Sequence, residues 1–309
     1  MTLVCKKVEP VPIEERDFLR GESRREARKI ESRAVSLSGA LLAYLKVKRR
    51  RLIRDMIKEI RKTGKISEVR KASSSERQRL IKILSYYGLK QIDDSGRELM
   101  GSEWSVPDPF IADYLASKKK MINGLDSRIE KEFQSAVGKA LFKWMQEKPA
   151  PDMEVIARRL QRLLEVKSQK EAPKDLKAMG DRFTENGLLA RSRMIARTEI
   201  NAARNYGRVE AGKALGRTHL VWLANDDGRS GQRHHEALNG QVREIGKPFK
   251  NPKTGSELLY PGDPEASARF KRGGKVLRSK FGAAGEIINC RCSVRPISAQ
   301  VAARLRGRK

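Results

Sequence analysis

The sequence predicts a mainly α-helical protein with a small α+β C-terminal domain, preceded by an elongated helical N-terminal region. Hydrophobic residues make up 39% of the chain and aromatic residues 6%, while charged residues reach 34%. This composition favours elongated helices with much solvated surface over one dense core. No proline interrupts residues 13–106, whereas β-rich and turn-forming segments follow residue 217.

The first helix is marked by an apolar stripe. Its members recur at steps of four or seven residues, the spacing of one helix face. They are Leu41, Leu45, Leu52, Met56 and Ile60.

Two further elements are expected before the first proline break. Ser73 and Glu76 form a capping-box pattern that starts a second helix, which runs to residue 88. Residues 89–100 alternate weakly around an Asp-Asp-Ser-Gly sequence and predict a small hairpin. Pro107 marks a break in the chain.

Two more helices follow this break. Residues 110–146 predict a helix that is interrupted near Asn123 and Gly124. A Pro-rich linker at 147–151 separates it from a helix that Asp152 caps.

We place the domain boundary near residues 171–177. Residues 1–172 form the basic, mostly helical N-terminal region, with sub-boundaries near 107 and 149. Residues 177–297 form the C-terminal domain, and residues 298–309, which contain no acid, form a flexible basic tail. No stretch reaches the roughly 18–20 apolar residues of a bilayer span, so we expect a soluble protein made in a cytoplasm.

The charge of the chain predicts attraction to polyanions. Lys and Arg number 67 against 38 Asp and Glu, a net charge of +29, which favours contact with nucleic acid or acidic proteins. The segment 46–90 is especially basic and is either a solvated helix face or a strip that contacts phosphates. The candidate nucleic-acid or partner contacts are Lys46, Lys48, Arg49, Arg50, Arg51, Arg204 and Arg208.

Residues 187–216 predict a long helix that ends at a glycine. Arg197, Arg204 and Arg208 fall on one face of it. We expect Arg197 and Glu199 to pair with neighbours, because buried charges persist only when paired. Arg204 and Arg208 are expected to point outward.

The remaining segments of the C-terminal domain predict strands and turns. Residues 218–223 are β-rich and predict a strand, and a short helical piece is expected around 232–238. Asn239-Gly240 predicts a type I′ turn before a strand at 241–243. A further turn is expected at 251–255.

His235, Cys290 and Cys292 are candidate ligands of a structural zinc ion. Two thiolates and an imidazole would supply most of a tetrahedral site. Against this, Cys-x-Cys is tighter than the usual ligand spacing, and the histidine lies more than fifty residues upstream. The alternative is that His235 hydrogen-bonds nearby loops while the cysteines pack as small hydrophobic residues. No other cofactor is expected.

A nuclease of the HNH type is a second alternative, built on His234, His235 and Asp227. That chemistry needs a histidine base beside a metal held by further ligands on a following helix. No histidine follows His235, so we expect no enzymatic activity.

Four sparse patterns follow one another in the last third of the chain. They are Ala-Arg-Thr-Glu at 196–199 on a helix, residues 222–227 leading to His-His at 234–235 and Leu-Asn-Gly at 238–240, Tyr-Pro-Gly-Asp-Pro at 260–264, and Asn-Cys-Arg-Cys at 289–292. In this order and spacing they resemble the head-morphogenesis domain of tailed bacteriophages, the family of phage Mu protein F and related minor head proteins. The resemblance covers roughly residues 177–297. The residues that carry the family patterns are Arg197, Glu199, Asn205, Trp222, Asp227, His235, Gly240, Pro261 and Asn289.

The resemblance implies a minor capsid protein of a tailed phage or prophage. Such a protein acts at the portal vertex or in the capsid interior, in head morphogenesis and in DNA packaging or delivery. Its partners would be the portal protein and the scaffold or capsid proteins, with double-stranded DNA against the basic surface. It would reside in the virion head after assembly in the host cytoplasm. A non-viral architectural DNA-binding protein remains an alternative.

Overall fold

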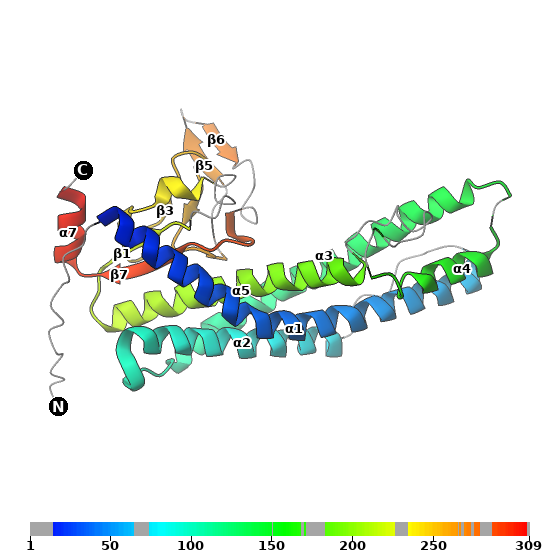
Figure 1. The fold of residues 1–309 in the computed structure, drawn as a ribbon, viewed down its shortest axis with the longest axis horizontal. Coiled ribbons are helices and arrows are strands. Elements are labelled where there is room, and N and C mark those ends of the chain that lie inside the picture. Colours follow the sequence, from blue (N-terminus) through cyan, green and yellow to red (C-terminus); the bar gives the residue numbers. More distant parts are fainter. Residues whose placement is uncertain are drawn as a thin grey trace.

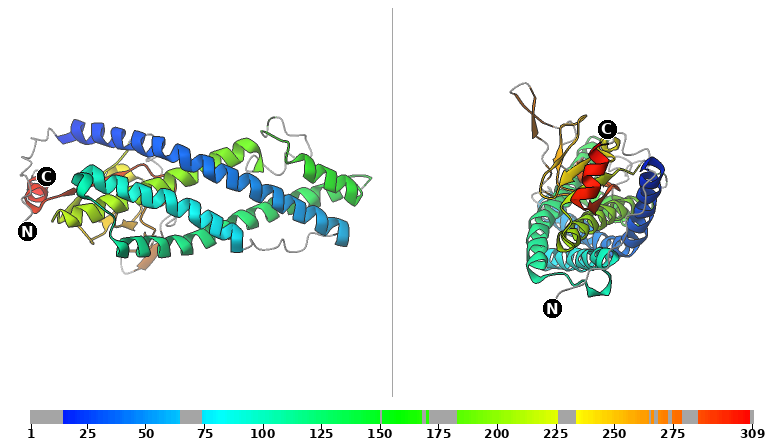
Figure 2. Two further views of the ribbon diagram at one scale, coloured as in Figure 1. Left: turned by 90° about the horizontal axis from the view of Figure 1, so that it is seen from below. Right: turned by 90° about the vertical axis from the view of Figure 1, so that its left-hand side faces the viewer.

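The computed structural model describes residues 15–64, 74–149, 151–167, 170, 183–225, 234–264, 266, 269–272, 275–278 and 286–307. Long helices run along the molecule, and a small group of strands lies beside one end of them (Figures 1 and 2). The predicted fold class, mainly α with a small α+β part, is confirmed. None of the described helices combines the length and the apolar character of a membrane span.

The helical body is built from α1 (Glu15–Thr63), α2 (Ser74–Met100) and α5 (Glu185–Ala214). The helix expected at 187–216 is therefore confirmed. Helix α5 packs along both α1 and α2 and also contacts strand β7 (Ser293–Ile297). The side chains that form the shared core include Leu37, Leu41, Leu84, Leu188 and Ile200.

The predicted domain boundary near 171–177 falls between α4 (Met153–Arg162) and α5. Because Leu41 and Ile200 lie in one core, side chains from both sides of that boundary pack together. Helix α5 thus belongs to the helical body and also supports the strands.

A second core lies at the other end of α1, where α3 (Asp108–Met145) and α4 pack on it (Figure 1). The apolar stripe of α1 serves both cores, since Leu52, Met56 and Ile60 lie in this one. The Asp152 side chain accepts a hydrogen bond from the Val155 amide at 2.7 Å, which confirms the expected cap of α4.

Helix α3 is continuous through Asn123 and Gly124, so the expected interruption there is wrong. One internal glycine costs a helix only about 1 kcal/mol. The packing of α3 on both sides of this point, by Tyr114 before it and by Phe133 and Trp144 after it, outweighs such a cost.

The hairpin expected at 89–100 is also wrong, because α2 continues to Met100, where the 3-10 helix η1 (Gly101–Glu103) follows. The glycines in α2 permit close packing and do not form a turn. A Cβ atom at Gly96 would lie 2.0 Å from the Trp104 ring nitrogen, and one at Gly88 would lie 1.8 Å from the Tyr114 hydroxyl.

The small sheet has the order β2-β1-β7, and its strands are antiparallel. Strand β1 (His219–Leu223) lies at the centre and confirms the strand expected at 218–223. Its partners are β2 (Val242–Glu244) and β7, and Val221 pairs with both Val242 and Arg295.

Two short hairpins complete the β part of the described chain. Strand β3 (Phe249–Lys250) pairs with β4 (Glu257–Leu258) around the turn expected at 251–255. Strand β5 (Arg269–Arg272) pairs with β6 (Lys275–Arg278).

The C-terminal residues expected to form a flexible tail are helical from Ala299 to Gly307, forming α7. Ala302 packs with Val221, Val242 and Ile297 on one face of the sheet. The opposite face presents side chains such as Trp222 to a separate core. Because both faces are covered, β1 is buried throughout.

Asn239 and Gly240 do form a turn, but not of type I′. Asn239 has φ −56° and ψ 128°, and Gly240 has φ +73°, which are the angles of a type II turn. The Asn239 side chain accepts a hydrogen bond from the Ala224 amide at 2.9 Å, and the Gly240 amide donates to the Trp222 carbonyl at 2.8 Å. The turn is thus anchored to the end of β1.

Candidate metal centre

His235, Cys290 and Cys292 meet in the core beneath the sheet. The Nδ1 atom of His235 lies 3.5 Å from Cys290 Sγ and 3.6 Å from Cys292 Sγ. The histidine is 1% exposed and each cysteine 2%. A metal site needs at least three histidine, cysteine or acidic side chains close together. Within the described part of the chain, these three residues are the group that meets this condition.

Local backbone geometry brings these side chains together. His234 (φ +54°) and Asn289 (φ +60°) both adopt left-handed conformations, so the chain turns sharply immediately before His235 and before Cys290. His235 then begins the 3-10 helix η5 (His235–Leu238). Trp222 of β1 packs edge-on against the imidazole, with ring centroids 5.6 Å apart.

A second layer of polar groups orients the histidine. The Nε2 atom of His235 lies 3.0 Å from the fully buried Glu286 carboxylate. The other carboxylate oxygen accepts a hydrogen bond from the Ser256 hydroxyl at 2.7 Å, and Ser256 accepts one from Thr254 at 2.9 Å. Nδ1 therefore faces the sulfur atoms while Nε2 faces Glu286.

Sequence reasoning missed Glu286, Ser256 and Thr254. They come from loops far from His235 in sequence, and no spacing rule links them to it. One signal was present: Glu286 is the sole acidic residue after Glu265.

The two thiols of the cluster differ in their pKa values. Burial disfavours the imidazolium, but the neighbouring Cys290 and Glu286 outweigh it and raise the pKa of His235 to about 9. The pKa of Cys290 lies well below its ordinary value, since Cys292 and His235 donate hydrogen bonds to its thiolate. The pKa of Cys292 is raised well above its ordinary value by that same hydrogen bond and by burial.

Helix α5 holds the Asn289–Cys292 segment at both ends. Arg197 hydrogen-bonds the Asn289 side chain, and the Asn289 amide donates to the Thr198 hydroxyl at 2.8 Å. Further along, Asn205 donates to the Cys292 carbonyl at 3.3 Å and to the Pro261 carbonyl at 3.1 Å. Arg197 also makes a two-pronged ion pair with Glu31 of α1, at 2.7 and 2.6 Å.

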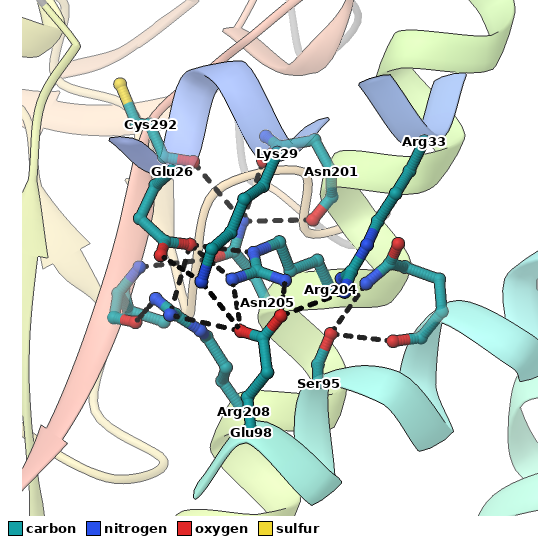
Figure 3. Close-up of polar contacts among 12 residues, drawn as sticks. Glu26, Lys29, Arg33, Ser95, Glu98, Asn201, Arg204, Asn205, Arg208 and Cys292 are labelled. Carbon is teal, nitrogen blue, oxygen red and sulfur yellow. Dashed lines mark hydrogen bonds and ion pairs between the residues drawn. The ribbon is translucent and has the colours of Figure 1, made fainter. Parts of the chain in front are cut away.

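Beside this segment, Arg204 and Arg208 form a buried ionic cluster with carboxylates from α1 and α2 (Figure 3). Arg204 is 0% exposed and lies 2.5 Å from Glu26 and 2.6 Å from Glu98. Arg208 lies 3.0 Å from Glu26 and donates to the Val294 carbonyl. The prediction that these two arginines point outward is wrong, because this face of α5 meets other helices and not solvent.

The basic residues at 46–51 differ in burial, because some of them pack inside the helical body. Lys48 is 1% exposed and pairs with Asp126 and Glu130. Arg49 is buried and donates to the carbonyl groups of Phe183 and Leu164. These two residues are therefore not phosphate contacts, and that part of the prediction is wrong.

The other three members of this run lie closer to the surface. Lys46 contacts Glu185, and Arg51 pairs with Glu76 and Glu130. Arg50 is exposed.

The remaining predicted site residues are placed as follows. Glu199 is buried on α5. His234 is exposed and lies 3.3 Å from Glu236, so the two adjacent histidines diverge. Asp227, the third residue of the nuclease hypothesis, lies outside the described residues.

Comparisons with known proteins give no assignment. No family model matches the chain, and no match was found among curated proteins or solved structures.

Proposed function

We propose that this chain is a non-enzymatic minor head protein of a tailed phage or prophage, acting at the portal vertex or in the capsid interior. The observation that carries this proposal is the convergence of the family-pattern residues. Arg197 contacts Asn289, Asn205 bonds the Pro261 carbonyl, and Trp222 packs on His235. These contacts support the proposal, because they join the segments that carry the separate family patterns.

The surroundings of His235 favour a structural role over catalysis. Both ring nitrogens are engaged, Nδ1 by the two cysteines and Nε2 by Glu286. A general base must lie within hydrogen-bonding reach of the substrate proton it removes, and a histidine that is 1% exposed does not reach a phosphodiester at the surface. The nuclease alternative is therefore less well supported.

A basic surface on α1 supports contact with packaged DNA. Arg50, Arg54, Lys58 and Lys62 recur every four residues and are exposed, so they lie along one face of the helix. We refer to these four residues as the α1 basic stripe. Helices with basic faces contact the phosphate backbone without reading sequence, as a protein lying against packaged DNA would need to do.

Co-expression with the portal protein encoded in the same genome tests the proposal. We expect a complex that survives size-exclusion chromatography, while the major tail protein serves as a negative control. In a parallel tube with Mg²⁺ and plasmid DNA, we expect the plasmid to stay intact. Absence of a portal complex, together with plasmid cleavage that is lost in His235→Ala, would contradict the proposal and support the nuclease alternative. DNA binding without any head-protein complex would instead support a non-viral architectural protein.

A further inference from the structure

We propose that His235 Nδ1, Cys290 Sγ and Cys292 Sγ bind a structural Zn²⁺ ion that fixes the C-terminal loops to each other and to α5. This inference goes beyond the proposed function and does not depend on it. It rests on the distances within the cluster, its outer partners and its enclosure.

The distances are those of a zinc site. Zinc binds thiolate sulfur at about 2.3 Å and histidine nitrogen at about 2.0–2.1 Å. At a tetrahedral angle, these bond lengths place nitrogen and sulfur about 3.6 Å apart. The distances from His235 Nδ1 to the two sulfur atoms are 3.5 and 3.6 Å. Both nitrogen–sulfur distances thus match those around one shared ion, and the three ligand atoms lie within 4.8 Å of one another.

The outer partners are those that metal-bound histidines have. A metal-binding histidine typically donates its second ring N–H to a carboxylate, which fixes the tautomer and the ring orientation. His235 meets Glu286 in this way at 3.0 Å, and Ser256 holds the other carboxylate oxygen. Thr254 in turn donates a hydrogen bond to Ser256, so the buried side chains of Glu286, Ser256 and Thr254 together orient the imidazole ring.

The two cysteines share the site despite their tight spacing. The Cys292 amide points back to Cys290 Sγ at 3.4 Å, a contact that stabilises a thiolate charge. The left-handed Asn289 turns the chain immediately before Cys290. A Cys-x-Cys segment therefore directs both sulfurs to one point here.

Hydrogen bonds from His235 and Cys292 to Cys290 give each sulfur a partner, but they leave the close approach of His235 Nδ1 to Cys292 unexplained. One imidazole N–H bonds best along a nearly straight line to one acceptor, yet Nδ1 lies at nearly equal distances from both sulfurs. A metal ion between the three atoms satisfies all of them at once.

The surroundings indicate a structural rather than a catalytic ion. Trp222, Leu238 and Phe249 belong to the same buried core as both cysteines. Catalytic zinc sites keep a position open to substrate, whereas this one is enclosed by apolar side chains. The described ligand set supplies three of the four tetrahedral corners, so the enclosure by apolar side chains is the observation that favours a structural ion.

The test is the metal content of the full-length chain, purified without an affinity-tag metal column and measured by atomic emission. We expect about one zinc per chain. Removal of zinc by a strong chelator lowers the thermal midpoint, and Zn²⁺ restores it. Replacement by Co²⁺ gives the thiolate-to-cobalt charge-transfer absorption of a tetrahedral site.

Matched variants locate the ligands. Cys292→Ser and His235→Ala lose the bound zinc, whereas the control variant Cys5→Ser retains it. Glu286→Gln keeps the ligands but binds zinc about 10–100-fold more weakly, as expected for an outer partner. If a variant fails to fold, the zinc content and the chelator response of the wild-type chain still decide the question.

Wild-type chain without zinc, with a thermal midpoint insensitive to chelator and to added Zn²⁺, overturns the proposal. Zinc retained in both Cys292→Ser and His235→Ala also overturns it, because the ion would then lie elsewhere. Neither outcome affects the portal experiment, which tests the proposed function separately.

Discussion

The side-chain amide of Asn205, on α5, donates a hydrogen bond to the backbone carbonyl of Cys292 at 3.3 Å. The same side chain accepts a hydrogen bond from the Val294 amide at 2.9 Å. One buried residue of the helical body thus fixes both the candidate metal centre and the start of β7. The helical and α+β parts are therefore joined through specific polar contacts as well as through apolar packing.

Asn205→Ala is expected to lower the free energy of unfolding by about 2–4 kcal/mol, because it leaves buried backbone groups of Pro261, Cys292 and Val294 without this partner. Urea denaturation followed by circular dichroism measures the change. Asn186→Ala, at an exposed position on the same helix, is the control and should stay within about 0.5 kcal/mol of wild type. Equal effects in both variants would contradict the bridging role of Asn205.

Arg204→Ala should destabilise the protein by about 3–5 kcal/mol, because it leaves the buried Glu26 without its main partner and also removes a partner of the more exposed Glu98. The exposed Arg193 lies on the same helix, and Arg193→Ala serves as the matched control. Thermal unfolding of both variants measures the difference. A small effect of Arg204→Ala would show that the cluster in Figure 3 contributes little to stability.

Stability is expected to fall in acid partly through Glu98. Burial disfavours its charged form, but the hydrogen bond and charge of Arg204, with Lys29 and Arg33, lower the pKa of Glu98 to about 2. Since the unfolded carboxyl titrates at the ordinary value of 4.5, the stabilisation is complete above that pH. It is lost as the pH falls from 4.5 towards 2.

Glu98→Gln should therefore flatten the pH dependence of stability in this interval. Urea midpoints at about pH 3 and pH 6 measure it. If the urea midpoint of Glu98→Gln changed with pH as much as that of the wild type, Glu98 would not be the source of the acid sensitivity.

Glutamate substitutions at Arg50, Arg54 and Lys58 should weaken DNA binding. Each phosphate contact that is lost reduces the slope of log affinity against log salt by about 0.9, so the slope should fall by about three. The control carries the same charge change at Arg128, Lys131 and Lys139, which are exposed on α3. Fluorescence anisotropy over a salt series measures both. An equal loss in both variants would show that total charge, and not the α1 basic stripe, determines binding.

Local signals in the sequence predicted much of the fold. The apolar stripe from Leu41 to Ile60 lies in the two helical cores, and the β-rich segment at 218–223 forms the central strand. Both depend on periodicity within one element, which the sequence displays directly. The turn at Asn239-Gly240 was also predicted, although its backbone angles are those of type II and not of type I′.

The burial of individual side chains and the pairing of residues far apart in the sequence could not be predicted from such local patterns. Periodicity shows that Arg204 and Arg208 share a face, but not that Glu26, 178 residues from Arg204, covers it. Lys48 is buried for the same reason, since its partners Asp126 and Glu130 come from α3. The ligand set itself could be named from residue type, whereas its outer partner Glu286 emerged only from the fold.

The most direct test of the proposed function is the location of the chain in particles. Phage particles produced from the genome that encodes the chain are purified, separated into heads and tails, and examined by quantitative mass spectrometry. The account predicts the chain in the head fraction, at a copy number well below that of the major capsid protein. Purified particles that lack the chain, with all of it left in the host lysate, would contradict the account.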